Sequence, residues 1–314
     1  MDIQKLKQKK SIQELLEFGI IVFDKPADCT SFDVSDFVRR KLKLKKTSHF
    51  GTLDPMVTGV LPIALGRATK LTGFFLGEDK EYIGTMRIHE DVSLEEIRKV
   101  INEKFMGTII QLPPVKSRVK RQEREREIKK FELLEKKGKE VSFLVECQGG
   151  TYVRKLVHDL GEEMKIGAHM IHLKRIRAGI FVEKEMITKE DFEKAVEEFE
   201  EAITHTHCET QHQITHTHRE ALKDGEGKEE KLRRMIIPAE IVSEVYPIVQ
   251  IKEDDLKHIL TGKPIHKIDL IKNEKFENNK IVCAFIENRF IGMYKVSNNG
   301  DIFAMPEFVL QPVN

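Results

Sequence analysis

One short segment, residues 46–70, combines a carboxylate with loop-forming residues. Asp54 precedes a proline, and a residue in that position is biased toward extended backbone and away from helix. Gly51 and Gly59 bracket Asp54 in a loop that leads into the apolar run 60–65. A carboxylate on a loop held by a buried strand is well placed for nucleophilic catalysis. An aspartate before proline is also a common turn residue, so spacing alone leaves both interpretations open.

Three further side chains could take part in such chemistry, and each also has an ordinary structural explanation. Tyr82 lies in a strand-like run, where a tyrosine is commonly a core or edge residue. Arg154 lies in a helical pattern and would by itself be a charge on a helix surface. His49 by itself would be a loop histidine.

The elements that must position these residues mix strands and helices without a regular βαβ alternation. Strand-like runs lie at 19–23, 60–65, 81–89, 128–135, 141–147 and 281–287. Helical patterns lie at 32–43, 93–105, 151–165, 188–202 and 254–261. This mixture favours an α+β fold over a doubly wound sheet.

The length of 314 residues favours two domains, with smaller segments around them. Residues 1–18 read as a polar arm that ends in a short amphipathic helix and packs on the C-terminal domain. We predict a catalytic domain over 19–240, with a His-rich surface insertion at about 203–220. Residues 241–314 contain short strands and turn signals, which predict a small β-rich domain.

Charge is segregated although the formal net charge is only +1. Residues 39–46 carry six positive charges and no negative one, and residues 116–130 have a net charge of +5. Residues 187–201 have a net charge of −5 and lie elsewhere in the sequence. The composition excludes a polybasic protein of the histone kind, but the basic runs favour a bounded phosphate-contacting face. Each single run could also be a solvated helix face.

The cysteine spacing and the hydropathy pattern indicate the cellular compartment in which the protein works. The cysteines, at positions 29, 147, 208 and 283, form no Cys-x-x-Cys pair, which argues against a disulfide scaffold or a zinc ribbon. The basic start has no apolar region behind it, and no apolar run approaches 18 residues. We therefore expect a cytoplasmic protein without a membrane span.

The histidine tract around residues 205–218 could in principle bind Zn²⁺ or Ni²⁺. Its His-x-His spacing does not match a structural zinc finger, and its flanks are polar. We expect a surface insertion and no metal site.

A series of motifs occurs in one order between residues 24 and 179, and together they resemble the TruB family of pseudouridine synthases. The motifs are Asp24-Lys25-Pro26 with Thr30-Ser31, His49-Phe50-Gly51-Thr52-Leu53-Asp54-Pro55, Thr58-Gly59-Val60-Leu61-Pro62, Gly66-Arg67-Ala68-Thr69-Lys70, Lys80-Glu81-Tyr82, Gln111-Leu112-Pro113-Pro114 with Val119-Lys120-Arg121, Gly150-Thr151-Tyr152-Val153-Arg154, Gly167-Ala168-His169-Met170 and Leu173-Lys174-Arg175-Ile176-Arg177-Ala178-Gly179.

The resemblance implies that the chain isomerises uridine in RNA to pseudouridine, without a redox cofactor, nucleotide or metal. Asp54 would be the nucleophile, attacking either the sugar or the base. Arg154 would pair with Asp54, keeping it ionised and oriented. Tyr82 would stack on the uracil after it leaves its helical stack. The implied substrate-binding residues are His49, Lys25, Pro26, Leu173, Lys120 and Arg121, with Lys25 and Pro26 bracing the Asp54 loop.

Within the family, the residues of these motifs are most similar to those of the dyskerin-like catalytic subunits of box H/ACA ribonucleoproteins. This implies a catalytic domain with a mixed, largely antiparallel sheet and a C-terminal PUA domain. It also implies rRNA as substrate, an H/ACA guide RNA and small H/ACA core proteins as partners. Two alternatives stay open: a stand-alone synthase that acts on the T-loop of tRNA, and an inactive RNA-binding scaffold.

Some positions depart from the family pattern. Phe32 replaces a histidine, and Ser48, Phe50 and Met56 replace the usual glycine, serine and lysine around Asp54. These departures bear on RNA contacts near residue 50, not on the three candidate catalytic residues.

Overall fold

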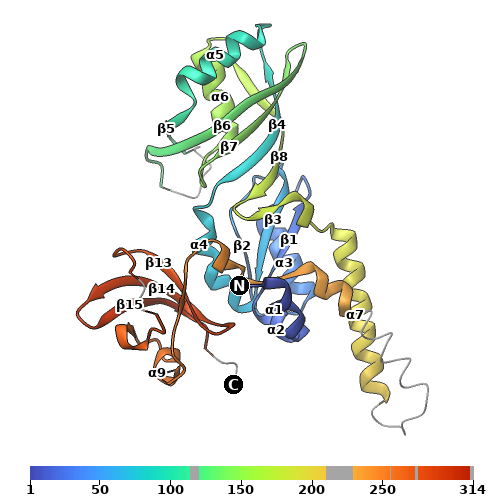
Figure 1. Cartoon of the computed structure of the whole chain (residues 1–314). Helices are drawn as coiled ribbons and strands as arrows, with labels where there is room; N and C mark the ends of the chain where they lie inside the picture. The colour runs from blue at the N-terminus through green and yellow to red at the C-terminus, as the bar shows by residue number, and fades with distance from the viewer. Residues whose placement is uncertain (114–119, 210–228, 255, 273–274, 312–314) are drawn as a thin grey trace.

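Two β-sheets organise the molecule (Figure 1). The computed structural model describes residues 1–113, 120–209, 229–254, 256–272 and 275–311. Within these residues, a large sheet fills the centre and upper part of the view and a five-stranded sheet lies to its lower left. The predicted α+β class is confirmed.

The large sheet has the strand order β10-β1-β3-β8-β4-β7-β6-β5, with β2 paired to β3 and β9 to β8. Its strands are β1 (Gly19–Lys25), β2 (Thr47–His49), β3 (Thr58–Leu65), β4 (Lys80–Ile88), β5 (Gly107–Gln111), β6 (Arg124–Lys137), β7 (Glu140–Cys147), β8 (Ala168–Ala178), β9 (Phe181–Val182) and β10 (Ile236–Pro238). Strands β3 and β8 are parallel, and every other strand pair described in this sheet is antiparallel. The mixed, largely antiparallel sheet is therefore confirmed.

Burial along the strands follows their side-chain patterns. The apolar stretch of β1 from Ile20 to Phe23 is buried throughout, as expected for a strand that is covered on both faces of the sheet. Strand β4 alternates instead: every second residue from Lys80 to Ile88, including Tyr82, is buried, and the residues between them are more exposed. Because successive side chains in a strand point to opposite faces, Lys80 and Tyr82 lie on the same inner face.

The helices cover the large sheet or extend from it (Figure 1). They are α3 (Ser31–Lys41), α4 (Thr72–Leu76), α5 (Leu94–Lys104), α6 (Val153–Glu163) and α7 (Lys189–Glu209). Helices α5 and α6 lie by the upper half of the sheet, and α7 runs away toward the lower right. The prediction for α7 was wrong at its end, because the helix continues to Glu209 rather than stopping near residue 202. No glycine or proline occurs between residues 203 and 209, so nothing in that stretch breaks the helix.

The N-terminal arm forms two short helices, α1 (Ile3–Lys9) and α2 (Ile12–Glu17). A capping box between Ser11 and Glu14 starts α2, which buries its apolar residues as predicted. The ammonium of Lys10 pairs with the buried carboxylate of Glu240 at 2.5 Å. Arg233 donates hydrogen bonds to carbonyl groups at the end of α1. Most of the arm thus lies on the β10 region.

The small sheet has the order β11-β13-β14-β15-β12. Its strands are β11 (Ile248–Gln250), β12 (Ile265–His266), β13 (Ile281–Ile286), β14 (Arg289–Asn299) and β15 (Ile302–Val309), with helix α9 (Leu256–Leu260) beside them. The sheet is consistent with a PUA-like domain, and Figure 1 shows it beside α4 and the N-terminal helices.

One apolar core joins the two sheets. It contains Phe18, Val60 and Phe75 from the large part of the chain and Phe285 and Phe290 from the small sheet. The rings of Phe18 and Phe290 stack with their centroids 5.4 Å apart. Because these side chains are almost completely buried together, the small sheet is packed onto the rest of the molecule rather than tethered to it.

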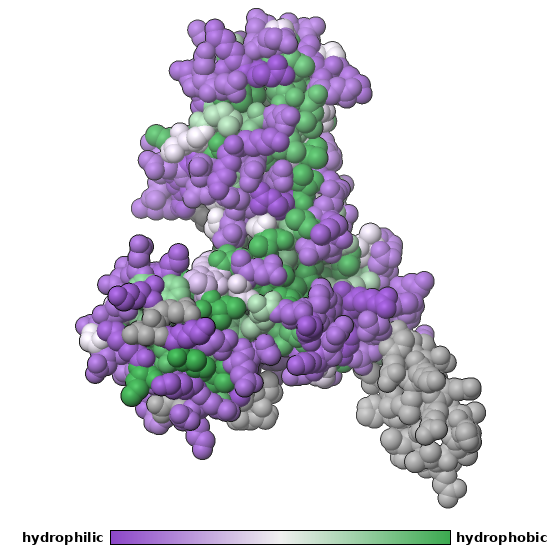
Figure 2. Space-filling model, in the orientation of Figure 1, coloured by the Kyte–Doolittle hydropathy of each residue, from purple (hydrophilic) through white to green (hydrophobic). Residues whose placement is uncertain are grey.

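Apolar side chains make up the smaller part of the face shown in Figure 2. Hydrophilic residues cover most of that face, and a narrow hydrophobic band runs down the upper half of the molecule. None of the described helices is long and apolar enough to cross a lipid bilayer.

Candidate active site

The loop between β2 and β3 holds Asp54 at its centre. The amide of Val57 donates to the carbonyl of Asp54 at 3.0 Å, which closes a tight turn over four residues. The buried ammonium of Lys25 reaches this turn from the end of β1. It donates to the carbonyl groups of Pro26, Pro55 and Val57 at 2.8–2.9 Å. Lys25 thus braces the loop from below, and its ammonium faces the protein rather than solvent.

A second anchor lies just before Asp54. The buried hydroxyl of Ser31 accepts a hydrogen bond from the amide of Leu53 at 2.8 Å and lies 3.1 Å from its carbonyl oxygen. Phe50 is buried and stacks on Phe75 with the ring centroids 4.7 Å apart. Phe50 is thus a core residue, which places this departure from the family pattern away from any RNA contact.

Arg154 approaches Asp54 from the first turn of α6. Its Nη1 atom donates to Oδ2 of Asp54 at 3.0 Å, and both side chains remain more than half exposed. The backbone at Tyr152 is fixed by the side-chain amide of Gln111, which accepts from the Tyr152 amide at 3.0 Å. An exposed ion pair contributes only about 0–1 kcal/mol to stability. We therefore assign this pair an orienting role rather than a stabilising one.

Tyr82 lies beneath the loop on the inner face of β4 and is 7% exposed. Burial raises the pKa of its phenol, and a hydrogen bond with the Arg175 guanidinium opposes that rise. The charge of Asp54 also acts on the Tyr82 pKa, so the two side chains share one electrostatic environment. Asp54, Arg154 and Tyr82 are distant in sequence, and the fold brings them together.

The sequence analysis missed the role of Arg175 on β8. Its side chain is 1% exposed, and it donates through Nε to the carbonyl of Val60 at 2.8 Å and through Nη2 to the carbonyl of Gly51 at 3.1 Å. Arg175 therefore links the Tyr82 phenol to both flanks of the Asp54 loop. A signal was present: Arg175 is two residues from Leu173 in a strand and so shares its buried face.

Two buried or half-buried titratable side chains, Lys80 and His49, lie near the Arg175 charge. Lys80 is 4% exposed, and burial, followed by the Arg175 charge, lowers its pKa to about 8. His49 has its pKa lowered by burial first and by the Arg175 charge second, and its Nε2 atom lies 3.2 Å from the Thr52 hydroxyl. His49 is therefore held close to the loop as a neutral imidazole at pH 7.

The other predicted substrate-binding residues are placed differently. Leu173 is buried in β8 opposite Gly84, where its side chain belongs to the apolar core of the large sheet. Pro26 is exposed beside the loop, and its carbonyl accepts from Lys25. Lys120 and Arg121 are exposed before β6, and no described hydrogen bond or ion pair joins them to the candidate catalytic residues. Pro114 and Val119 of the same motif lie outside the described residues.

The charge pattern needs one correction. The acidic run is not remote from the first basic run, because α7 packs against the end of α3. Lys41 pairs with Glu193 at 2.9 Å, and Lys43 pairs with Glu200 at 2.7 Å. Opposite charges at this helix contact therefore neutralise two of the six cations of the run 39–46, which the sequence suggested as part of an RNA-binding face.

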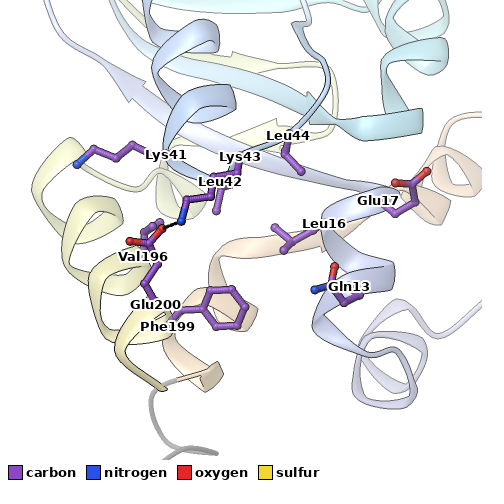
Figure 3. A pocket seen from close by; sticks show the side chains of 10 residues that line it. All are labelled: Gln13, Leu16, Glu17, Lys41, Leu42, Lys43, Leu44, Val196, Phe199 and Glu200. Carbon is purple, nitrogen blue, oxygen red and sulfur yellow. Dashed lines mark ion pairs between the residues drawn. The ribbon is translucent and has the colours of Figure 1, made fainter. Parts of the chain in front are cut away.

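A cavity of about 320 Å³ lies at this same helix contact (Figure 3). Leu16, Leu44 and Phe199 contribute apolar side chains, and the Lys43–Glu200 pair closes its rim. None of the residues that line it is a candidate catalytic residue. We interpret the cavity as a packing gap between α2, α3 and α7.

The described residues contain no group of three or more histidine, cysteine, aspartate or glutamate side chains that could hold a metal ion. Residues 210–228 of the histidine tract, and the side chains of residues 203–209, lie outside the described part of the chain. The prediction about that tract therefore stays a prediction.

Comparison with protein-family models gives two matches. Residues 39–153 match the N-terminal domain of the TruB family of pseudouridylate synthases. Residues 154–243 match the C-terminal domain of tRNA pseudouridylate synthase B. The first match contains Asp54 and Tyr82, and the second begins at Arg154.

Two curated relatives have descriptions that agree with the family-model matches. A probable tRNA pseudouridine synthase B of Methanopyrus kandleri is 39% identical over 85% of this chain and 72% of the relative. A protein with the same description from Methanocaldococcus jannaschii has the same identity and coverage.

Solved structures extend the likeness to the whole chain. A Cbf5–Nop10–Gar1 complex matches with a TM-score of 0.82 and 31% identity, over 98% of this chain and 89% of the matched one. A Nop10–Cbf5 complex of an archaeal box H/ACA sRNP matches with a TM-score of 0.80 and 30% identity, over 98% and 90%.

Proposed function

Because the chain belongs to the TruB family of pseudouridine synthases, we propose that Asp54, Arg154 and Tyr82 carry out its isomerisation of uridine in RNA. The observation that carries this assignment is the ion pair between Asp54 and Arg154, which joins residues 100 positions apart in the sequence. Arg154 orients the carboxylate of Asp54, which is more than half exposed, so an extruded nucleotide can reach it.

The chemistry requires one bond exchange and one proton transfer. The bond between C1′ of the ribose and N1 of the base breaks, and a bond from C1′ to C5 forms. The proton on C5 leaves and N1 gains one, so the reaction is an isomerisation with no net redox change. Asp54 acts as the nucleophile that separates these events into two easier steps. Tyr82, set below the carboxylate, contacts the base while it turns.

We further propose that a box H/ACA guide RNA selects the uridine in rRNA, and that small core proteins assist. The likeness to Cbf5 within archaeal H/ACA complexes supports this, as does the five-stranded sheet packed beside the catalytic part. In this arrangement the C-terminal PUA domain, residues 241–314, holds the guide RNA. The names of the curated relatives support a second candidate, a stand-alone synthase that modifies tRNA. A cytoplasmic location stays a prediction.

Tritium release separates these candidates. The protein is incubated with RNA that carries [5-³H]uridine, with and without a guide RNA and the small core proteins. Release only with the guide supports guided modification of rRNA, and release from bare tRNA supports the stand-alone synthase. No release from folded, RNA-bound protein in any format would contradict both and leave an RNA-binding scaffold.

The role of Asp54 has its own test. We expect Asp54→Asn to abolish tritium release and to leave RNA binding within about twofold, because the amide keeps the shape but is a poor nucleophile. Asp91→Asn is the matched control, since Asp91 is also an exposed aspartate paired with a cation, Lys136. Loss of RNA binding in Asp54→Asn alone would contradict a purely chemical role.

A further inference from the structure

Two strongly exposed apolar side chains flank the candidate nucleophile. Phe32 is 69% exposed and Met56 is 63% exposed. Among the large apolar side chains that the structure describes, only Ile268 and Ile110 reach comparable exposure. Exposed apolar surface is unfavourable in water, and where it gathers at a site it marks a place for a partner.

Phe32 lies next to Ser31, which hydrogen-bonds with the Asp54 loop. The hydroxyl of Ser31 forms the two contacts with Leu53 described above. Phe32 directly follows Ser31, and Asp54 directly follows Leu53, so both side chains emerge next to one buried hydrogen-bonded pair.

Met56 follows Asp54 by two residues. It occupies the tight turn that starts at Asp54, and Lys25 binds the carbonyl groups of both of its neighbours, Pro55 and Val57. The backbone of Met56 is therefore fixed while its side chain points into solvent.

The backbone that carries Phe32 is also fixed before any ligand arrives. Thr30 and Asp33 form a complete capping box at the start of α3, which fixes the first turn of this helix. A phenylalanine on a fixed backbone has only two side-chain torsions to order when it binds a flat partner.

We propose that Phe32 and Met56 form a platform that stacks an unpaired base of the substrate, next to the target uridine. This inference rests on the proposed function, because an enzyme that extrudes a base works on locally unpaired RNA. The platform adjoins the Asp54–Arg154 pair, where the target nucleotide must sit, so a neighbouring nucleotide is the occupant that the RNA chain delivers there. An aromatic ring stacks on any base, which suits a synthase that acts on varied sequences.

Fluorescence of 2-aminopurine tests the platform. The base analogue replaces the nucleotide on either side of the target uridine, in whichever RNA format supports tritium release. With the unchanged protein we expect stacking to quench the fluorescence at one of these two positions. Phe32→Ala should remove the quenching and weaken RNA binding by about tenfold, the loss of one stacked base. Phe32→Tyr should keep both, and Leu134→Ala, another exposed apolar residue, should behave as the unchanged protein.

An abasic nucleotide at the same position completes the test. If Phe32 stacks on that base, Phe32→Ala should weaken binding of the intact RNA but not of the abasic RNA. Equal weakening of both RNAs, or unchanged quenching in Phe32→Ala, would overturn the platform and point to a protein partner for this surface. Tritium release that persists in either case would show that the proposed function stands while this inference fails.

Discussion

At the scale of single residues, the site combines an exposed ion pair with a buried cationic centre. Asp54 and Arg154 face solvent, where RNA can reach them. Arg175 lies underneath, almost completely buried, and holds the loop and the Tyr82 phenol. In the proposed function the two exposed residues would meet the substrate, and the buried Arg175 would fix their geometry.

Arg175→Gln should slow catalysis without abolishing RNA binding. The shorter, neutral side chain loses the link between Tyr82 and the two loop carbonyls, and a small displacement of reacting groups lowers rates on the order of 100-fold. Tritium release under single-turnover conditions measures the rate, and circular dichroism checks folding. Arg177→Gln on the same strand is the control, since Arg177 pairs with Glu81 and Glu146 instead. Equal rates in the two variants would rule out a positioning role for Arg175.

Lys80 should make stability depend on pH just above neutrality. Its pKa is about 8 in the folded state, so between pH 8 and its ordinary value near 10.5 the unfolded chain binds more protons. Stability should therefore rise with pH in this window, by about 1 kcal/mol from pH 8 to 9. Chemical denaturation measures the slope, and Lys80→Met should flatten it. Above pH 9 the thiol of Cys147, with a pKa raised by burial to about 12, acts in the opposite direction.

At the scale of elements, the site depends on the place where β3 and β8 run parallel. Gly59 begins this contact with a φ of +98°, and a Cβ atom there would lie 2.2 Å from the carbonyl oxygen of Arg175. The closeness of the two backbones brings the Arg175 side chain under the Asp54 loop.

Gly59→Ala should therefore destabilise the protein by about 3 kcal/mol or more, through both backbone strain and the clash. Gly107→Ala separates the two causes, because Gly107 also has a positive φ, of +73°, but open space around its Cα atom. We expect that control to lose only about 1 kcal/mol. Urea denaturation followed by fluorescence or circular dichroism would give both values, and similar losses would contradict the close approach.

Sequence patterns predicted β1, β3, β4, β7, β13 and the helices α3, α5 and α6 to within a few residues, since hydrophobic periodicity and capping residues act locally. They did not mark β5, β8, β14 or β15 as individual strands. They also marked Asp54, Tyr82 and Arg154, which the fold gathers. They missed Arg175, because local patterns do not show that a strand charge is satisfied by distant carbonyl groups. They also did not show that the acidic run pairs with the basic run 39–46, because helix pairing is a tertiary contact.

At the scale of the whole molecule, the shared apolar core makes the two sheets one unit. Phe18→Ala removes the ring that stacks on Phe290 at this junction. We expect a loss of about 3 kcal/mol, as for other buried phenylalanine truncations. Calorimetry should show one transition for the unchanged protein, and the variant should separate into two or shift downward. A Tm equal to that of the unchanged protein would show that the junction contributes little.

The joined core also bears on the distance between the small sheet and Asp54. On a flexible linker the small sheet would move freely, and RNA bound to it could present many different nucleotides to Asp54. Tyr246 also donates to the carbonyl of Phe74 at 2.8 Å across the same junction, which adds a polar contact to the apolar packing. If the small sheet holds RNA as proposed above, this packed junction limits which nucleotides along that RNA can reach Asp54.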